Sequence, residues 1–268
     1  MNVVNSSSLQ ISNTSLILAA GLVLIALYIG YREKLGIDRD MIIGVLRAIV
    51  QLYIVGYLLK YVIKVDNIFL TVVLMLIIIF NAGYNAMKRS QGIPNTLWIS
   101  IGAIFISTGV TVGAMVLTHA LKFIPAQMIP ITGMMASQSM VAIGLCYRNL
   151  NTNFHDERQQ VLEKLSLGGN IKQSSMHILR ESIKTGMQPT VDSTKTMGIV
   201  TLPGMMSGLI FAGIDPVYAI EYQIMITFML LAATSLGSVM AVYWSYKGFY
   251  NREDQLVLPT SAPKKKHH

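Results

Sequence analysis

Seven long apolar runs dominate this 268-residue sequence. A helix that crosses a membrane needs about 20 consecutive, mostly apolar residues. Strands of a membrane β-barrel would be about 10 residues long and would alternate polar with apolar side chains, which these runs do not. Charged residues make up only 13% of the chain, against about 25% in a soluble domain. We therefore predict an all-α integral membrane protein with seven transmembrane helices. The expected spans are Ser15–Tyr31, Met41–Val62, Ile68–Met87, Leu97–Leu121, Ile129–Tyr147, Met197–Gly213 and Val217–Tyr246.

Lysine and arginine are distributed very unevenly between the two sides that these spans define. If the N-terminus lies outside, 17 of the 21 fall inside, and only Lys60, Lys64 and Lys122 fall outside. Because cytoplasmic loops are rich in Lys and Arg, we expect the N-terminus outside and the C-terminus inside, in the inner (plasma) membrane. The net charge of +8 is then a topology signal, and we expect the lipid bilayer, and no nucleic acid, as a partner.

The domain organisation follows from the one long segment between spans. Residues 1–250 are expected to form a single transmembrane domain with an inside loop at 150–196, and residues 251–268 a C-terminal tail, in part a tag. The loop predicts two helices, His155–Leu167 and Ile171–Thr185, separated by Gly168-Gly169. Gly186 and Pro189 are expected to end the second helix. The first span lacks a basic segment before it and is predicted to be permanent, not a cleaved signal.

Motifs for catalysis are not found in the sequence. It contains no G-x-x-x-x-G-K-[ST] loop for ATP. It contains neither H-E-x-x-H nor clustered Cys and His for a catalytic metal. We therefore expect a protein that is not itself an enzyme and binds no cofactor of its own.

Polar residues inside the expected spans are candidates for a transport pathway, because they are costly in hydrocarbon. Arg47 and Gln51 lie one turn apart on the second span. They form either the polar wall of a pathway, or an arginine that reaches the inner surface beside a glutamine bonded to a neighbouring helix. Asn81, four residues before Asn85, is interpreted as a contact between helices or as pathway lining. Glu221 lies near the outer edge, where it either anchors the helix or meets substrate.

Interruptions and methionines give further pathway candidates. Pro203, with Gly204, is expected to break the sixth span, and interrupted spans often flank a transport path. Four methionines, Met134, Met135, Met205 and Met206, lie on the fifth and sixth spans. They provide either thioether ligands for a soft ion such as Cu(I) or flexible packing.

Three stretches resemble one known family. They are Arg47–Tyr57, Ile129–Met140 with Glu163–Gly169, and Met197–Gly208 with Asp215-Pro216 and Tyr222-Gln223. They look like the FetB family of iron-export ABC permeases, to which plant aluminium-tolerance permeases are related. The Leu-Pro-Gly-Met-Met-Ser-Gly segment at 202–208 is the most specific part. The family usually has Gly-Asn where this chain has Ser137-Gln138, so the substrate lining near Gln138 is expected to differ.

The resemblance implies a permease subunit that pairs with a separate ABC ATPase, two copies of each forming the transporter. ATP and Mg²⁺ would be bound by the partner. The residues implied to couple the two subunits are Glu163, Leu167, Gly168, Gly169 and Arg180.

The expected function is export of iron or another metal from the cytoplasm, driven by the partner's ATP hydrolysis. Iron export follows from the resemblance alone, because the spans show no cage of carboxylates or histidines. An organic or chelated substrate is one alternative. An ion-coupled secondary transporter is another, although that class usually buries carboxylates and only the shallow Glu221 is available.

Overall fold

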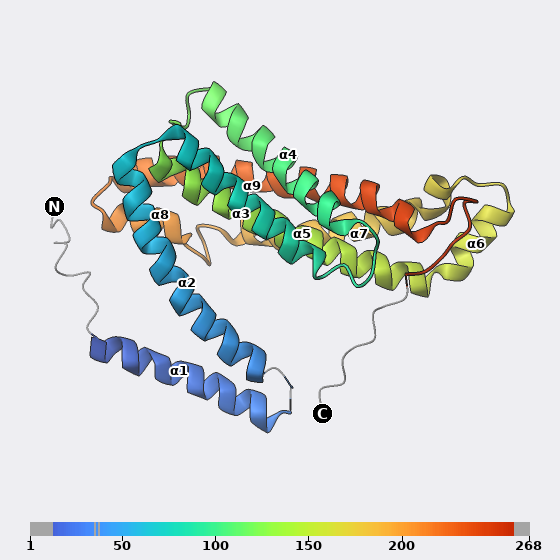
Figure 1. The fold of residues 1–268 in the computed structure, drawn as a ribbon, viewed down its shortest axis with the longest axis horizontal. Helices are drawn as coiled ribbons and strands as arrows, with labels where there is room; N and C mark the ends of the chain where they lie inside the picture. Colours follow the sequence, from blue (N-terminus) through green and yellow to red (C-terminus); the bar gives the residue numbers. More distant parts are fainter. Residues whose placement is uncertain (1–12, 35, 37, 260–268) are drawn as a thin grey trace.

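The computed structural model describes residues 13–34, 36 and 38–259 (Figure 1). In these residues the chain is helical throughout and contains no strand longer than an isolated bridge. The helices are α1 (Asn13–Arg32), α2 (Asp38–Val65), α3 (Ile68–Met87), α4 (Thr96–Leu117), α5 (Pro125–Asp156), α6 (Arg158–Ser166), α7 (Ile171–Thr196), α8 (Gly204–Phe211), α9 (Pro216–Ser245) and the short 3₁₀ helix η2 (Tyr246–Phe249).

Helices α5 and α9 are the centre of a bundle that also contains α3, α4 and α7. Both begin at the same end of the bundle and run along its long axis, while α7 returns in the opposite direction (Figure 1). Small buried residues let their backbones approach closely. At Gly237 of α9, an added Cβ would lie 3.4 Å from Ser107 Oγ of α4 and 3.6 Å from Ser139 Oγ of α5. Three helices therefore meet at this glycine.

The prediction of an all-α membrane protein is confirmed in its coarse form. Five helices among the described residues are long and apolar enough to cross a membrane: α2, α3, α4, α5 and α9. The apolar segment of α1, Leu18–Arg32, is shorter. The bounds of α3 agree with the predicted span Ile68–Met87, whereas α5 extends nine residues beyond Tyr147, to Asp156.

The sixth predicted span, Met197–Gly213, is not one helix. Residues 197–203 are not helical, and α8 has only eight residues, about 12 Å at 1.5 Å per residue. Gly198 adopts a φ of +84°, which favours glycine, and its N–H donates to Thr201 O at 2.9 Å. Pro203 precedes the first residue of α8. The expected break at Pro203-Gly204 is therefore confirmed, but it is wider than predicted.

The prediction that Gly186 and Pro189 end a helix is wrong, because α7 continues through both to Thr196. Gly186 lies where α7 crosses α5, and an added Cβ would collide with Cys146 Sγ and Ala142 O. The glycine therefore permits close packing. The expected helix His155–Leu167 is also divided: α5 ends at Asp156 and α6 begins at Arg158. The second half of the predicted inside loop thus packs back along the bundle.

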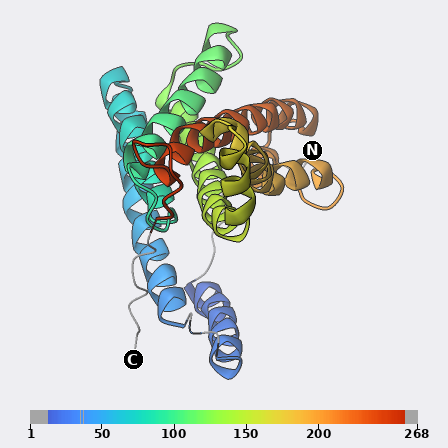
Figure 2. The same ribbon diagram turned by 90° about the vertical axis from the view of Figure 1, so that its right-hand side faces the viewer.

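Helix α2 contacts the bundle only slightly, through α5, and α1 contacts α2. Figure 2 shows α1 and the first part of α2 standing away from the remaining helices. None of the residues in the most apolar window of α2 is buried. Its apolar surface is therefore available to lipid or to another protein chain.

We expect Gly186→Ala to destabilise the contact between α5 and α7. The added side chain has no room, and overpacking of this kind costs about 1–3 kcal/mol. The apparent unfolding temperature of the detergent-purified protein should fall. Gly208→Ala is the matched control, because an added Cβ there meets nothing within 4 Å. Equal behaviour of the two variants would contradict the close approach.

Candidate functional site

A cleft of about 420 Å³ lies where the break before α8 meets α9. It is lined by Thr194, Met197, Gly198, Leu202, Pro203, Met206, Ile220, Gln223, Ile224, Thr227 and Phe228. A smaller cleft of about 170 Å³ shares Thr194, Met197 and Thr227 with it and is completed by Gln138, Pro189, Thr190, Ser193 and Leu230. The two clefts therefore adjoin, and they bring α5, α7, the break and α9 to one place.

Gln223 of α9 is the buried polar group of this site. Its side chain lines the larger cleft and is 6% exposed, and its Oε1 has no hydrogen-bond partner. One turn later, the Thr227 hydroxyl lies 2.8 Å from Gln223 O and 3.1 Å from Met197 Sδ, and it can donate to either. A buried amide oxygen without a partner costs about 1–3 kcal/mol. It marks a position where a ligand group can donate a hydrogen bond.

The site lies well inside the lengths of both α5 and α9. Gln138 is the thirteenth residue after Pro125 in α5, and Thr227 the eleventh after Pro216 in α9. At 1.5 Å per residue these positions are about 20 and 17 Å from the beginnings of their helices. The hydrocarbon core is about 30 Å thick, so we expect the site to lie close to its midplane when both helices begin at the membrane surface.

The outward face of α7 carries an ion pair at a similar depth. Lys195 Nζ lies 3.3 Å from Asp192 Oδ1, and Gln188 Nε2 donates to both carboxylate oxygens of Asp192 at 2.9 Å. Thr190 lies beside Gln138 in the smaller cleft, so Lys195 is about 12 Å from the beginning of α5. Lys195 and Asp192 are exposed. Exposed charges are costly in lipid, so we expect water or another protein chain beside α7.

The other end of the bundle carries a helical projection made of α6 and the beginning of α7. Leu167, which follows α6, is 88% exposed. Gly168 adopts a φ of +87°, and Gly169 N donates to Lys164 O, which closes the turn. Asn170 and Gln173 then form a capping box that begins α7. The expected coupling residues Glu163, Leu167, Gly168 and Gly169 therefore lie together at one tip, with Arg180 exposed on α7.

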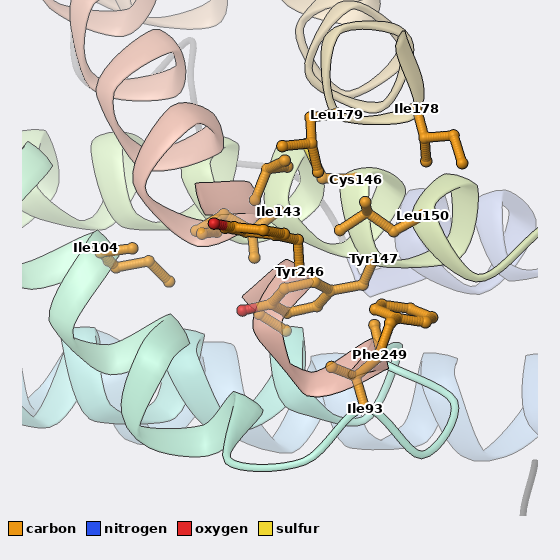
Figure 3. Packing of buried hydrophobic residues seen from close by; sticks show 14 of the residues in the cluster. Ile93, Ile104, Ile143, Cys146, Tyr147, Leu150, Ile178, Leu179, Tyr246 and Phe249 are labelled. Atoms are coloured by element: carbon orange, nitrogen blue, oxygen red, sulfur yellow. The ribbon is translucent and has the colours of Figure 1, made fainter. Parts of the chain in front are cut away.

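Aromatic packing fixes this projection to the bundle. Phe154 of α5 stacks on Phe249 of η2, with ring centroids 4.1 Å apart. Tyr250 lies edge-on to Phe154, and its hydroxyl bonds to Ser175 of α7. Burial raises the pKa of Tyr250, and the bond to Ser175 opposes that shift. Figure 3 shows Phe249 and Tyr246 gathered with Tyr147 and Leu150 of α5, and Ile178 and Leu179 of α7 nearby.

The sequence-predicted pathway residues do not form one group. Gln138, Pro203 and Met206 line the paired clefts. Asn81 lines a separate cleft between α2, α3 and α5, where its Oδ1 accepts from Asn85 Nδ2 at 2.7 Å within the same helix. Met134, Met135 and Met205 pack in an apolar cluster with Met128 and Ile226. Arg47 and Gln51 on α2 are exposed, as is Glu221 on α9, and none of the three lines either of the paired clefts.

Sequence reasoning missed most of the polar lining of the paired clefts. Gln223 and Thr227 are four residues apart on an apolar span, a signal of the same kind as Asn81 and Asn85. By its polar composition, the segment that contains Thr190, Ser193 and Thr194 is predicted to belong to the inside loop. That composition gives no sign that these residues lie beside α5 and α9. The described residues contain no group of three or more His, Cys, Asp or Glu that could hold a metal ion.

Comparison with known proteins gives the family. A family profile described as "Uncharacterised protein family (UPF0014)" matches residues 13–250. The chain belongs to the UPF0014 family. Among its relatives, the "Probable iron export permease protein FetB" of Escherichia coli is 52% identical over 252 residues, which cover 94% of this chain and 97% of the relative. No solved structure matches the chain.

More distant UPF0014 relatives extend to other bacteria and to plants. The "UPF0014 membrane protein YjkA" of Bacillus subtilis is 36% identical and covers 90% of this chain and 97% of its own length. The "Protein ALUMINUM SENSITIVE 3" of Arabidopsis thaliana is 29% identical, covering 87% of this chain and 86% of its own length. The resemblance that the sequence motifs indicated is confirmed, and the chain is a membrane protein of this family.

We expect Lys195→Cys to react with a water-soluble maleimide in membrane-embedded protein. Val110→Cys is the matched control. Val110 is also exposed and lies seven residues before the end of α4, about 10 Å from it. Both variants carry Cys146→Ser to remove the native thiol. Labelling should reach Lys195→Cys and not Val110→Cys, measured by gel shift. The reverse pattern would show that α7 faces lipid.

Proposed function

We propose that this UPF0014 protein is the membrane permease subunit of an ABC transporter that moves its substrate out of the cytoplasm. The observation that carries the proposal is the exposed tip at Leu167, held on a helix that aromatic packing fixes to α5, α7 and η2. A separate ATPase would dock at this tip, and the tip would transmit the motion of the ATPase to the helical bundle. The name of the Escherichia coli relative, a probable iron export permease, supports the direction of transport.

The proposal places the tip in the cytoplasm and the beginnings of α5 and α9 outside. The asymmetry of Lys and Arg supports this orientation. ATP and Mg²⁺ would bind to the partner, because this chain lacks the sequence of a phosphate-binding loop. In a bacterium the transporter would lie in the inner membrane. Residues 1–250 would then form the transmembrane permease domain.

Two copies of the permease would form the pathway. Arg47 and Gln51 are exposed on an apolar helix, and Asp192 and Lys195 are exposed on α7. In a single copy within lipid, all four would face hydrocarbon, which is costly for charged and polar groups. A second copy can enclose a water-filled path beside α7 and cover part of α2.

The cargo proposed from the relative's name is iron or another metal. An organic or chelated cargo is the second candidate, favoured by the lack of a His, Cys, Asp or Glu cluster among the described residues. An ion-coupled secondary transporter fits less well, because Glu221 lies only five residues into α9 and lines neither of the paired clefts.

Leu167→Asp combined with Glu163→Lys should abolish stimulation of the partner ATPase. The substitutions remove the exposed apolar tip and reverse a neighbouring charge, while both side chains are exposed and need not affect folding. The measurement is ATP hydrolysis by the co-purified partner in lipid. Lys60→Glu, on α2 near the opposite end, is the control and should retain coupling. Normal stimulation in the double variant would refute the docking tip.

The orientation predicts which introduced cysteines are accessible in intact cells. On a Cys146→Ser background, Lys122→Cys should react with a membrane-impermeant maleimide added outside. Leu167→Cys should react only after the cells are opened. Lys122 and Leu167 are both exposed. Lys122 precedes α5, whereas Leu167 follows α6, which lies at the other end of the bundle from the beginning of α5 (Figure 1). Labelling of Leu167→Cys in sealed cells would invert the topology and remove the cytoplasmic docking site.

A further inference from the structure

We propose that the paired clefts beside the helix break are the cargo site, and that the cargo bound there has no net charge. The cargo is then an organic molecule, or a metal ion held in a chelate of zero net charge, and not a bare metal ion. The inference rests on the proposed function and names the substrate class of that transporter.

The lining of the clefts is uncharged. Of the described residues that line them, none is Asp, Glu, Lys, Arg or His. A bare divalent cation that leaves water needs anionic or imidazole ligands, since an uncompensated charge in a low-dielectric site is very costly. Asp192 and Lys195 lie on the opposite face of α7 from Thr190 and Thr194 and neutralise each other. They supply no net charge to the clefts.

The polar groups are suited to hydrogen bonding. Gln223 lines the larger cleft, and its buried Oε1 has no hydrogen-bond partner. The Thr227 hydroxyl beside it, together with the hydroxyls of Ser193 and Thr194 across the cleft, can donate or accept. These groups are close to the bilayer midplane, where the interrupted helices of transporters hold their substrates.

Size and sulfur content also favour a molecule over an ion. The larger cleft, about 420 Å³, lies within the range of roughly 300–1,000 Å³ usual for small-molecule sites. Much of its remaining wall is apolar, including Ile224 and Leu202. Two thioethers, Met197 and Met206, line it, and the sulfur of Met197 is already 3.1 Å from the Thr227 hydroxyl. Within the part of the chain that the structure describes, these two are the only sulfur-containing residues that line it, so the cleft offers few ligands to a soft metal ion.

The first test is equilibrium binding to the full chain in lipid nanodiscs without the ATPase. The probes are Fe(II) alone under reducing conditions, the uncharged complex tris(maltolato)iron(III), and maltol without metal. The uncharged complex should bind at least about tenfold more tightly than Fe(II) alone. Maltol that binds as tightly as its iron complex identifies the organic molecule as the recognised part. Weaker binding of free maltol identifies the complete chelate.

Variants locate the binding. Gln223→Leu and Thr227→Val should each weaken binding of the uncharged complex by about tenfold, since each removes a buried hydrogen-bonding group. Thr234→Val is the matched control for Thr227→Val. Both threonines are buried on α9 and both donate to the carbonyl four residues earlier, at 2.8 Å for Thr227 and 2.7 Å for Thr234, but Thr234 is not in the clefts. Thr234→Val should stay within about twofold of the native affinity.

Three results would overturn the proposal: tighter binding of Fe(II) alone that Gln223→Leu removes, binding of the complex that Gln223→Leu leaves unchanged, or binding of none of the probes.

A second measurement needs no ligand. The variant is Thr194→Cys on the Cys146→Ser background, and the reagents are an uncharged and a cationic methanethiosulfonate. The rate of each reagent is divided by its rate at the exposed position Gln160→Cys. After this normalisation, the uncharged reagent should react about tenfold faster than the cationic one. A preference for the cationic reagent would also refute it. Because no ATPase is present, either failure leaves the coupling test of the proposed function standing.

Discussion

Hydrocarbon offers no hydrogen bonds to a polypeptide backbone, and this constraint governs the whole fold. Five long helices satisfy their backbone groups internally. The segment at 197–203 cannot, so it must lie against protein or water. It does so between α7 and α9, where Gly198 bonds back to Thr201 and the side chains of Gln223 and Thr227 face the gap. The interruption and the polar cleft therefore depend on each other, because the polar groups of either one would be costly in lipid without the other.

The close packing of α5, α7 and α9 makes that arrangement rigid. Gly186 brings α7 against Cys146 of α5, and Gly237 brings α9 against α4 and α5. Farther along, Phe154, Phe249 and Tyr250 pack together, and Tyr250 bonds to Ser175 near the beginning of α7. A displacement applied at Leu167 would therefore be carried along α7 toward the break, because α7 runs from the tip to Thr196 as one helix. Under the proposed function, α7 would link the docking tip at one end to the clefts at the other.

The sequence allowed prediction of those elements whose physical signal is local. Apolar length alone predicts α3 with its observed bounds, and Gly168-Gly169 correctly separates α6 from α7. The failures arise where tertiary contact overrides local preference. Gly186 and Pro189 are helix-breaking residues in isolation, but close packing on α5 keeps α7 helical through both. By composition, residues 190–196 look like a solvated loop. Only their position beside Gln138 and Thr227 shows that Thr190, Ser193 and Thr194 are part of the candidate site.

The aromatic stack between Phe154 and Phe249 also has a consequence for the order of biosynthesis. Phe154 belongs to the middle of the chain, whereas its partner Phe249 follows the last membrane helix. During translation, the α6 projection emerges long before the residues that hold it in place. Under the proposed function, a stable binding surface for the ATPase would form only when α9 has been inserted and η2 has folded back. Truncated chains would then fail to recruit the ATPase, and assembly would select for complete permeases.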